Sequence, residues 1–284
     1  MAMAGKSIST APAEPRFYYR DGLAVLRCVR ERPPPWMCYD ARLEAHVAPG
    51  YRLPELRAWA AAHGIGGDAG ADPTGGEPAP PFFDPRQPRE YQREALDRWL
   101  GANARGSVVL PTGAGKSFVA VLAIHETGLN ACVVAPTRAL VAQWFGQLAD
   151  GFGAERVGAY YADEKEIRPV TVTTYHSAFR LLERHGARFG LLVLDEAHHL
   201  ADAADGQAKA WHDALRIAPA AARLALTATY PDGRDAELRR TVGPVVYRRT
   251  IAEMADRELA DFAVERRFVA LTADERRRYD AADQ

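Results

Sequence analysis

Two segments of the chain combine residue types that suit nucleotide chemistry. The first, Leu110–Ser117, has the sequence LPTGAGKS, follows a β-rich run and opens a helix-like segment. Its glycines let backbone N–H groups turn toward phosphates, its lysine can reach β and γ phosphates, and its serine hydroxyl can ligate Mg²⁺. The Gly that the complete phosphate-loop pattern has at position 110 is missing. We predict phosphate binding by six residues: Thr112, Gly113, Ala114, Gly115, Lys116 and Ser117.

The second segment, Leu191–His198, has the sequence LLVLDEAH and brings two carboxylates 79 residues after Lys116. An apolar strand that ends in two acids suits a Mg-nucleotide site. Asp195 would hold Mg²⁺ together with Ser117, and Glu196 would polarise the attacking water. We therefore predict Lys116, Asp195 and Glu196 as the catalytic residues.

Each segment also has a simpler interpretation. The first is compatible with a glycine-rich turn that binds nothing, and the two acids are compatible with caps of the following helix. Because both segments occur together, with strand, loop, Lys-Ser pair and helix in order, a nucleotide site is favoured. For His199 we keep the structural interpretation.

The surrounding sequence alternates between short β-rich runs and helix-like segments. We expect strands at Ser107–Leu110, Ala131–Ala135, Val170–Thr174, Leu191–Leu194 and Leu224–Thr227. We expect helices at Arg89–Asn103, Lys116–Glu126, Arg138–Asp150, His176–Arg184, Gly206–Ile217 and Asp235–Thr241. This alternation predicts an α/β fold with a parallel sheet and helices on both faces. Ligands of such sheets bind at the carboxyl ends of the strands, where both chemical segments fall.

The motifs resemble those of superfamily 2 helicases over residues 82–284. Asp195–His198 is a DEAH box, and Thr227–Thr229, 32 residues after Asp195, is similar to motif III. Ala135–Arg138 resembles motif Ia, Val172–Tyr175 resembles motif Ib, and Pro88–Gln92 resembles the adenine-binding segment. The resemblance implies a RecA-like motor lobe with the cofactors ATP and Mg²⁺ and with DNA as partner.

Within that superfamily the chain most resembles the XPB-type DNA repair helicases of archaea and bacteria. Leu226–Tyr230, Thr250–Arg267 and Leu271–Tyr279 are similar to the end of their first motor lobe, and residues 39–57 to their small damage-recognition domain. The Arg-Glu-Asp motif of that family is not present in that form.

The resemblance implies roles for individual residues beyond the phosphate loop and the acidic box. Arg89 and Gln92 are implied to contact the adenine. His198, Thr227 and Thr229 are implied to couple the nucleotide state to DNA. Implied contacts with the DNA backbone are Thr137, Arg138 and Thr174, for which capping of helices or strand ends is the alternative.

A stretch rich in glycine and proline divides the chain. Residues 64–81, GIGGDAGADPTGGEPAPP, predict a flexible linker between a small α+β domain of residues 1–63 and the motor lobe of residues 82–284. The N-terminal domain carries nine Lys/Arg and six Asp/Glu, with aromatic residues interleaved among arginines. That pattern suits a stacking and phosphate-binding surface, and equally a small core with a solvated rim.

Composition excludes several classes of protein. With 284 residues, 48% hydrophobic and 26% charged, the chain can form a globular core, and its net charge of −1 argues against nonspecific electrostatic DNA binding by the whole chain. Its three cysteines are too scattered for a disulfide framework or a zinc site, which favours a reducing cytoplasm. The apolar runs are too short to span a membrane, and residues 1–15 do not resemble a secretory signal.

We therefore expect the N-terminal half of an ATP-dependent DNA helicase or translocase of the XPB type. A second RecA-like lobe, expected in the full-length chain, would supply an arginine finger, so this chain should bind nucleotide but hydrolyse it poorly. A nuclease or a repair protein is a candidate partner. The alternatives are the translocase lobe of a restriction or remodelling enzyme, and a non-enzymatic, nucleotide-gated module that binds DNA or protein.

Overall fold

The computed structural model describes residues 14–29, 31–67, 86–200, 206–254 and 272–282. It divides into two units, Met1–Thr250 and Ile251–Gln284. The first contains two β-sheets, and the second contains α8 (Ile251–Met254) and α9 (Ala273–Ala282). The division after Thr250 differs from the expected motor lobe of residues 82–284. Residues 68–81, most of the expected linker, lie outside the described part of the chain.

The N-terminal sheet has five strands in the order β3-β4-β2-β1-β5. Its elements are β1 (Arg16–Arg20), β2 (Leu23–Arg27), β3 (Cys38–Asp40), β4 (Ala45–Pro49), the 3-10 helix Gly50–Arg52, α1 (Leu53–Ala62) and β5 (Gly66–Gly67). Asp21 and Gly22, with φ of 48° and 81°, form the tight turn between β1 and β2, as Asp-Gly pairs do in hairpins. Leu53 and Leu56 of α1 pack into the core of this sheet, so the sequence from β1 to β5 forms a small α+β fold.

The start of the expected linker is wrong. Gly66 and Gly67 pair in parallel with β1, and Ile65 is buried in the N-terminal core. The glycine-rich composition gave no indication of this strand. A two-residue strand is stabilised by pairing with its neighbour and has no alternation of apolar and polar residues. The N-terminal fold therefore extends to Gly67.

The larger sheet has eight strands in the order β13-β6-β12-β11-β7-β10-β8-β9. Its strands are β6 (Arg105–Val109), β7 (Ala131–Ala135), β8 (Val157–Tyr161), β9 (Glu164–Lys165), β10 (Val170–Thr174), β11 (Leu191–Leu194), β12 (Ala222–Thr227) and β13 (Val245–Arg248). Every neighbouring pair is parallel except β8 with β9. The five expected strands are all present, and the three that were missed lie toward the two edges of the sheet.

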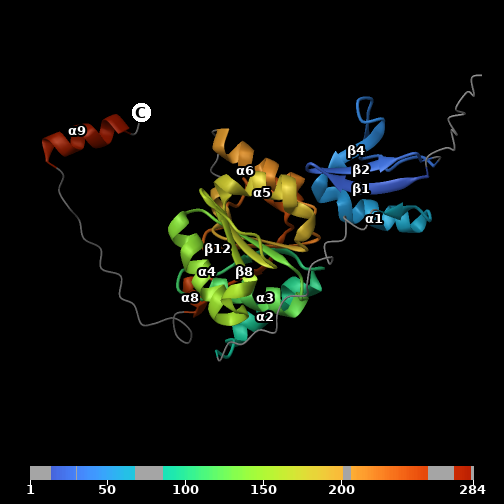
Figure 1. The fold of residues 1–284 in the computed structure, drawn as a ribbon. Helices are drawn as coiled ribbons and strands as arrows, with labels where there is room; N and C mark the ends of the chain where they lie inside the picture. The colour runs from blue at the N-terminus through green and yellow to red at the C-terminus, as the bar shows by residue number, and fades with distance from the viewer. Residues whose placement is uncertain (1–13, 30, 68–85, 201–205, 255–271, 283–284) are drawn as a thin grey trace, which may run out of the picture. The chain divides into compact units, whose positions relative to one another are not determined.

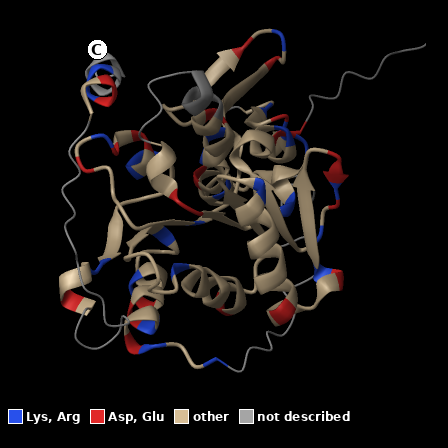
Figure 2. Ribbon diagram, turned by 90° about the vertical axis from the view of Figure 1, so that its left-hand side faces the viewer, with Lys and Arg blue, Asp and Glu red and all other residues tan. Residues whose placement is uncertain are grey.

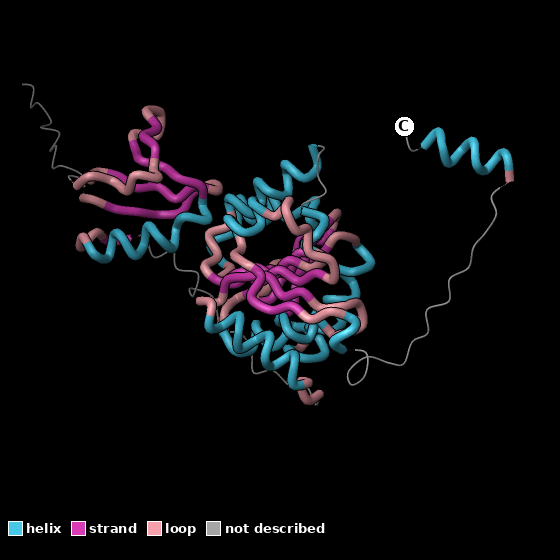
Figure 3. Tube along the Cα trace, turned by 180° about the vertical axis from the view of Figure 1, so that it is seen from behind, coloured by secondary structure: helices cyan, strands magenta, loops and turns pink. Residues whose placement is uncertain are grey.

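Helices cover both faces of this sheet. They are α2 (Glu90–Gly101), α3 (Lys116–Thr127), α4 (Arg138–Phe152), α5 (Tyr175–His185), α6 (Gly206–Ile217) and α7 (Ala236–Thr241), with 3-10 turns at Ala154–Arg156, Gly186–Arg188 and Ala197–Leu200. Each expected helix agrees within two residues at either end. α5 and α6 lie on one side of the strands, and α2 and α3 lie on the other (Figures 1 and 3). The α/β prediction with a covered parallel sheet is confirmed.

Burial explains why the central strands are so apolar. All four residues of β11 are fully buried, as expected for a strand between two helical layers. β6, β7, β10, β11 and β12 are paired in register near their carboxyl ends, for example Thr227 with Val109 and Thr174 with Ala135. The loops that follow these strands therefore meet at one edge of the sheet.

Charged residues are sparse in this interior, and basic and acidic residues are interspersed along the ribbon (Figure 2). An exception is Arg223 of β12, which is fully buried and donates hydrogen bonds to four backbone carbonyls, those of Leu215, Ala218, Ala220 and Thr241. These bonds connect the end of α6 with the end of α7. Among the described residues, no helix combines the length and apolar character needed to cross a membrane.

Candidate nucleotide site

The predicted phosphate loop joins the end of β6 to the start of α3. Gly113 and Gly115 have φ of 83° and 71°, in the left-handed region that glycine enters without strain. Leu110, which replaces the expected Gly, is fully buried, and its N–H donates to the carbonyl of Thr227 at 3.1 Å. This position therefore belongs to the strand end, and a side chain is accommodated there without entering the loop.

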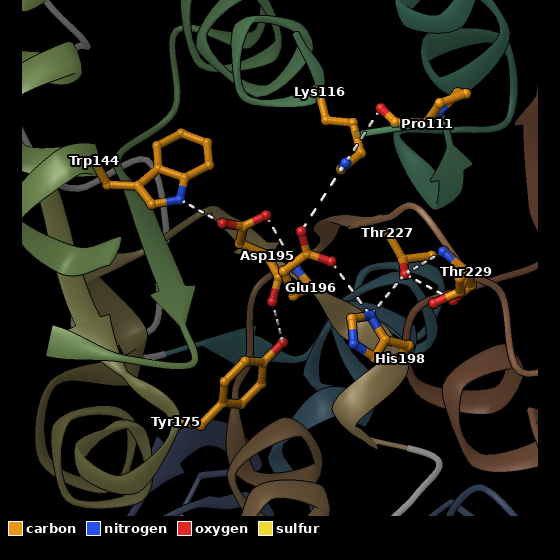
Figure 4. Close-up of polar contacts among 9 residues, drawn as sticks. All are labelled: Pro111, Lys116, Trp144, Tyr175, Asp195, Glu196, His198, Thr227 and Thr229. Atoms are coloured by element: carbon orange, nitrogen blue, oxygen red, sulfur yellow. Dashed lines mark hydrogen bonds and ion pairs between the residues drawn. The ribbon is translucent and has the colours of Figure 1, made fainter. Parts of the chain in front are cut away.

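Lys116 lies between the loop and the acidic box (Figure 4). Its Nζ is 3.5 Å from the carbonyl oxygen of Pro111 and 4.0 Å from Oε1 of Glu196. Lys116, Ser117, Asp195 and Glu196 line a cavity of about 300 Å³ together with Gly113 and Gly115. The structure thus brings the predicted phosphate, metal and catalytic residues together.

The Asp195 carboxylate is held by donors on both oxygens. Oδ2 accepts a hydrogen bond from Nε1 of Trp144 at 2.8 Å, and Oδ1 accepts one from the Glu196 backbone N–H at 3.0 Å. Burial raises the pKa of this carboxyl above its ordinary value, and the bond from Trp144 opposes that effect. The backbone carbonyl of Asp195 accepts a bond from the hydroxyl of Tyr175 at 2.9 Å.

Glu196 has a strained backbone. Its φ of 49° is in the left-handed region, which costs free energy for a residue with a side chain and is concentrated at functional sites. Its carboxylate lines the cavity, where Oε1 faces Lys116 and Oε2 lies 3.3 Å from Nδ1 of His198.

The three residues expected to couple nucleotide and DNA also lie together. Nδ1 of His198 lies 3.1 Å from Oγ1 of Thr227, and the Thr227 hydroxyl donates to the carbonyl of Thr229 at 2.8 Å. A continuous series of polar contacts thus runs from Glu196 through His198 to the loop after β12 (Figure 4).

Side chains of the expected adenine segment donate hydrogen bonds to the backbone of the phosphate loop. The Gln92 amide donates to the carbonyls of Ala114 and Gly115 at 3.2 and 3.3 Å, and the Tyr91 hydroxyl donates to Ala114 at 2.8 Å. Beside them is a cavity of about 400 Å³, also lined by Arg89 and by other residues of this region: Arg86, Gln87, Gly113 and Phe118. Adenine contact by Arg89 and Gln92 stays a prediction.

A magnesium ion fits this site only in company with phosphates. No group of three or more His, Cys, Asp or Glu within the described ranges is placed to hold a metal by itself. Ser117 and Asp195, which both line the cavity, are the predicted ligands among its side chains. This donor set matches Mg²⁺, which proteins usually bind through one or two side chains plus substrate phosphates and water.

Two of the three expected DNA contacts, Thr137 and Thr174, are helix caps. Oγ1 of Thr137 accepts from the N–H of Leu140 at the start of α4, and Oγ1 of Thr174 accepts from Ser177 at the start of α5, both at 3.2 Å. The capping alternative is therefore realised at both threonines. Because a capping hydroxyl accepts through oxygen, its own hydrogen is still free to donate to a phosphate.

A third cavity, of about 750 Å³, lies beside Thr174 and Arg138. It combines basic and aromatic side chains, and none of the described residues lining it is acidic: Arg138, Tyr160, Tyr161, Lys165, His176, Phe179, Arg180 and Arg184. This composition suits a nucleic acid, whose phosphates need cations and whose bases stack on rings.

Three residues of the site were missed by sequence reasoning: Tyr91, Trp144 and Tyr175. Each is apolar enough to be interpreted as core, and each is indeed buried. Their hydroxyl or indole groups reach the site from separate helices. Only the general tendency of buried Tyr and Trp to find a polar partner pointed to such roles.

A parallel sheet with a phosphate loop, an Asp-Glu-Ala-His segment and a Thr-Ala-Thr segment at one edge is typical of a RecA-like helicase lobe. The chain belongs to the family described as type III restriction enzyme, res subunit (ResIII), whose model matches residues 86–232.

Curated relatives agree with this class. The chain is 34% identical over 213 residues to the DNA 3'-5' translocase XPB2 of Sulfurisphaera tokodaii, a match that covers 72% of this chain and 45% of that protein. It is 34% identical over 179 residues to the DNA 3'-5' helicase XPB of Mycobacterium tuberculosis, covering 57% and 30%. The chain thus spans less than half the length of these relatives. The resemblance to XPB-type proteins is confirmed.

Among solved structures, the UvsW helicase from bacteriophage T4 shares 15% identity with a TM-score of 0.49, covering 83% of this chain and 100% of that one.

Proposed function

We propose that this chain is the ATP-binding motor lobe, with an attached N-terminal domain, of an XPB-type DNA helicase or translocase acting in DNA repair. The observation that carries the proposal is the convergence of Lys116, Asp195 and Glu196 on one cavity at the carboxyl edge of the sheet, with His198 in contact with Glu196. The likeness to XPB-type relatives supports DNA as the partner.

The residues divide the chemistry among them. The loop N–H groups and Lys116 bind the phosphates, and Glu196 orients and polarises the attacking water. Ser117 and Asp195 would hold Mg²⁺, which when bound would supply neutralisation of the negative charge on the phosphates. His198, in contact with both Glu196 and Thr227, responds to a displacement of either side.

The test is whether nucleotide and DNA binding depend on each other. Duplex DNA affinity of the chain should change when a non-hydrolysable ATP analogue and Mg²⁺ are added, measured by fluorescence anisotropy. If the chain binds neither the analogue nor ADP by calorimetry, the proposed function is wrong. Slow ATP hydrolysis by this chain alone stays a prediction.

We expect the basic cavity to contact DNA phosphates. Replacing Arg138 and Arg180 by alanine should weaken duplex binding. The negative slope of log affinity against log salt should become less steep by about 0.9 for each phosphate that the variant no longer neutralises. Affinity for ADP should not change, because neither side chain lines the nucleotide cavity. Anisotropy at several salt concentrations measures the effect.

Arg98→Ala is the matched control, since it removes an exposed arginine from α2 whose partner is Glu94. Equal salt slopes for the double variant, the control and the unchanged chain would show that DNA binds elsewhere. The N-terminal domain, where Tyr39 of the edge strand β3 is 61% exposed, would then be the next candidate. Damage recognition by that domain stays a prediction.

The second candidate function is the translocase lobe of a restriction enzyme, which the description of the ResIII family favours. The two candidates differ in their partners. Isolation of the chain from its own cells should recover a repair protein in the first case and a nuclease subunit in the second.

A further inference from the structure

We propose that Trp144 is a positioning residue that sets the orientation of the Asp195 carboxylate for Mg-nucleotide and links it to the DNA-facing end of α4. The inference rests on the proposed function and deepens it, because it assigns a route between the two ligands that does not pass through His198 and Thr227. Tyr175, on α5, donates a hydrogen bond to the backbone carbonyl of the same residue, Asp195.

The indole is placed to control the acid directly. Trp144 is 2% exposed and Asp195 is 8% exposed, so neither group exchanges its partner readily for water. The indole N–H donates to Oδ2 of Asp195, and the Glu196 backbone N–H donates to Oδ1. With one donor on each oxygen, the carboxylate plane is fixed and its remaining lone pairs are left for a ligand (Figure 4).

Trp144 also borders the space that a nucleotide would enter. It lines the same cavity as Lys116, Ser117 and Asp195. A tryptophan that only filled the core would not need its N–H directed at a carboxylate in this cavity. The hydrogen bond therefore serves the site as well as the packing of α4.

The connection to DNA follows from the helix that carries the indole. α4 is one continuous helix from Arg138 to Phe152, capped by Thr137. The expected DNA contacts are at its first turn, and Trp144 lies less than two turns further along. A rigid helix transmits a small displacement of its first turn to the indole, and so to Asp195.

α5 repeats the arrangement. Its N-cap is Thr174, the other expected DNA contact. Its first residue is Tyr175, whose buried hydroxyl donates to the Asp195 carbonyl. The side chain and the backbone of Asp195 are thus held by the two helices that begin at the expected DNA contacts. If DNA binding shifts these helices, Mg-nucleotide affinity must change, and linkage requires the reverse effect to be equal.

The test separates this role from simple stability by measuring how strongly Mg²⁺ raises nucleotide affinity. Trp144→Phe keeps an aromatic side chain and removes the N–H. By calorimetry, its affinity for ADP in EDTA should match that of the unchanged chain. The gain in affinity when Mg²⁺ is added should fall about 10-fold, and Mn²⁺ binding to the ADP complex, followed by electron paramagnetic resonance, should weaken in parallel. The effect of duplex DNA on Mg-ADP affinity should also shrink.

The chain offers a matched control in Trp99→Phe. Trp99 is also fully buried, and its Nε1 donates to the backbone carbonyl of Arg223 at 2.9 Å, away from the nucleotide cavity. Tyr175→Phe is the second test variant, and Tyr247→Phe, which loses a bond to Glu94 at 2.8 Å, is its control. Thermal melts establish that each variant folds.

Two outcomes in Trp144→Phe would overturn the proposal. In one, Mg²⁺ raises ADP affinity as much as in the unchanged chain; in the other, ADP affinity falls equally with and without Mg²⁺, which indicates a structural role. If Trp144→Phe does not fold, Tyr175→Phe decides: the link to Asp195 is overturned if Mg²⁺ and duplex DNA change its ADP affinity as they do in the unchanged chain. Failure of the unchanged chain to bind ADP under any condition would instead contradict the proposed function.

Discussion

Lys116→Ala should weaken ADP binding by about 1.5–3 kcal/mol, or roughly 10- to 150-fold, the contribution of a hydrogen bond to a charged group. The side chain is nearly buried, with its ammonium between the Pro111 carbonyl and the Glu196 carboxylate. Phosphates entering the cavity would replace these weak interactions by strong ones. Calorimetry with ADP and with a non-hydrolysable ATP analogue measures the loss.

The control is Lys165→Ala, which removes a lysine that lines the basic cavity beside Arg138. There its Nζ donates to the Ala162 carbonyl. We expect this variant to bind ADP as the unchanged chain does. The analogue should lose more affinity than ADP in Lys116→Ala, because the lysine reaches the γ phosphate as well. Unchanged affinities in Lys116→Ala would contradict the phosphate-loop assignment.

Arg223→Met should lower the free energy of unfolding by at least about 3 kcal/mol. Four buried carbonyls lose the Arg223 donor at once, and among the described residues only that of Thr241 keeps a second donor, Arg105. Each buried acceptor left without a partner costs about 1–3 kcal/mol. Burial lowers the pKa of this arginine to about 9, so it remains a cation at neutral pH. The carbonyls at the ends of α6 and α7 carry partial negative charge, which stabilises the guanidinium in place of a carboxylate.

Urea denaturation of the whole chain measures this loss. Arg105→Met is the matched control, because Arg105 donates to the carbonyls of Ala221 and Thr241 from a partly exposed position, where water can replace it. We expect a clearly smaller effect from the control. Similar losses for both variants would show that the buried hydrogen bonds of Arg223 contribute little.

Much of the nucleotide site could be predicted from the sequence because its parts are local. LPTGAGKS must follow a strand and open a helix for its N–H groups to converge, and LLVLDEAH is a buried strand with its acids at the end. The parallel arrangement then brings both to one edge of the sheet. The helix prediction was accurate for the same reason: the apolar pattern of each helix is local, and the capping residues Thr137 and Thr174 directly precede α4 and α5.

The edges of the two sheets could not be predicted in this way. β8 contains Gly158, β9 has two residues and β5 is Gly66–Gly67, so none carries a distinctive pattern. Such strands form because a partner strand offers hydrogen bonds, and that partner is distant in the sequence. The expected linker began too early for this reason.

The fold class, the phosphate loop, the acidic box and the family could thus be predicted from local sequence patterns. The side chains that hold these parts in place became known from the folded arrangement. Trp144 and Tyr175 lie 51 and 20 residues before Asp195, and no local pattern connects them with it. Likewise, the pairing of Arg223 with the ends of α6 and α7 depends on how those helices pack. Buried polar groups must find partners wherever the chain brings them, and that choice is made in three dimensions.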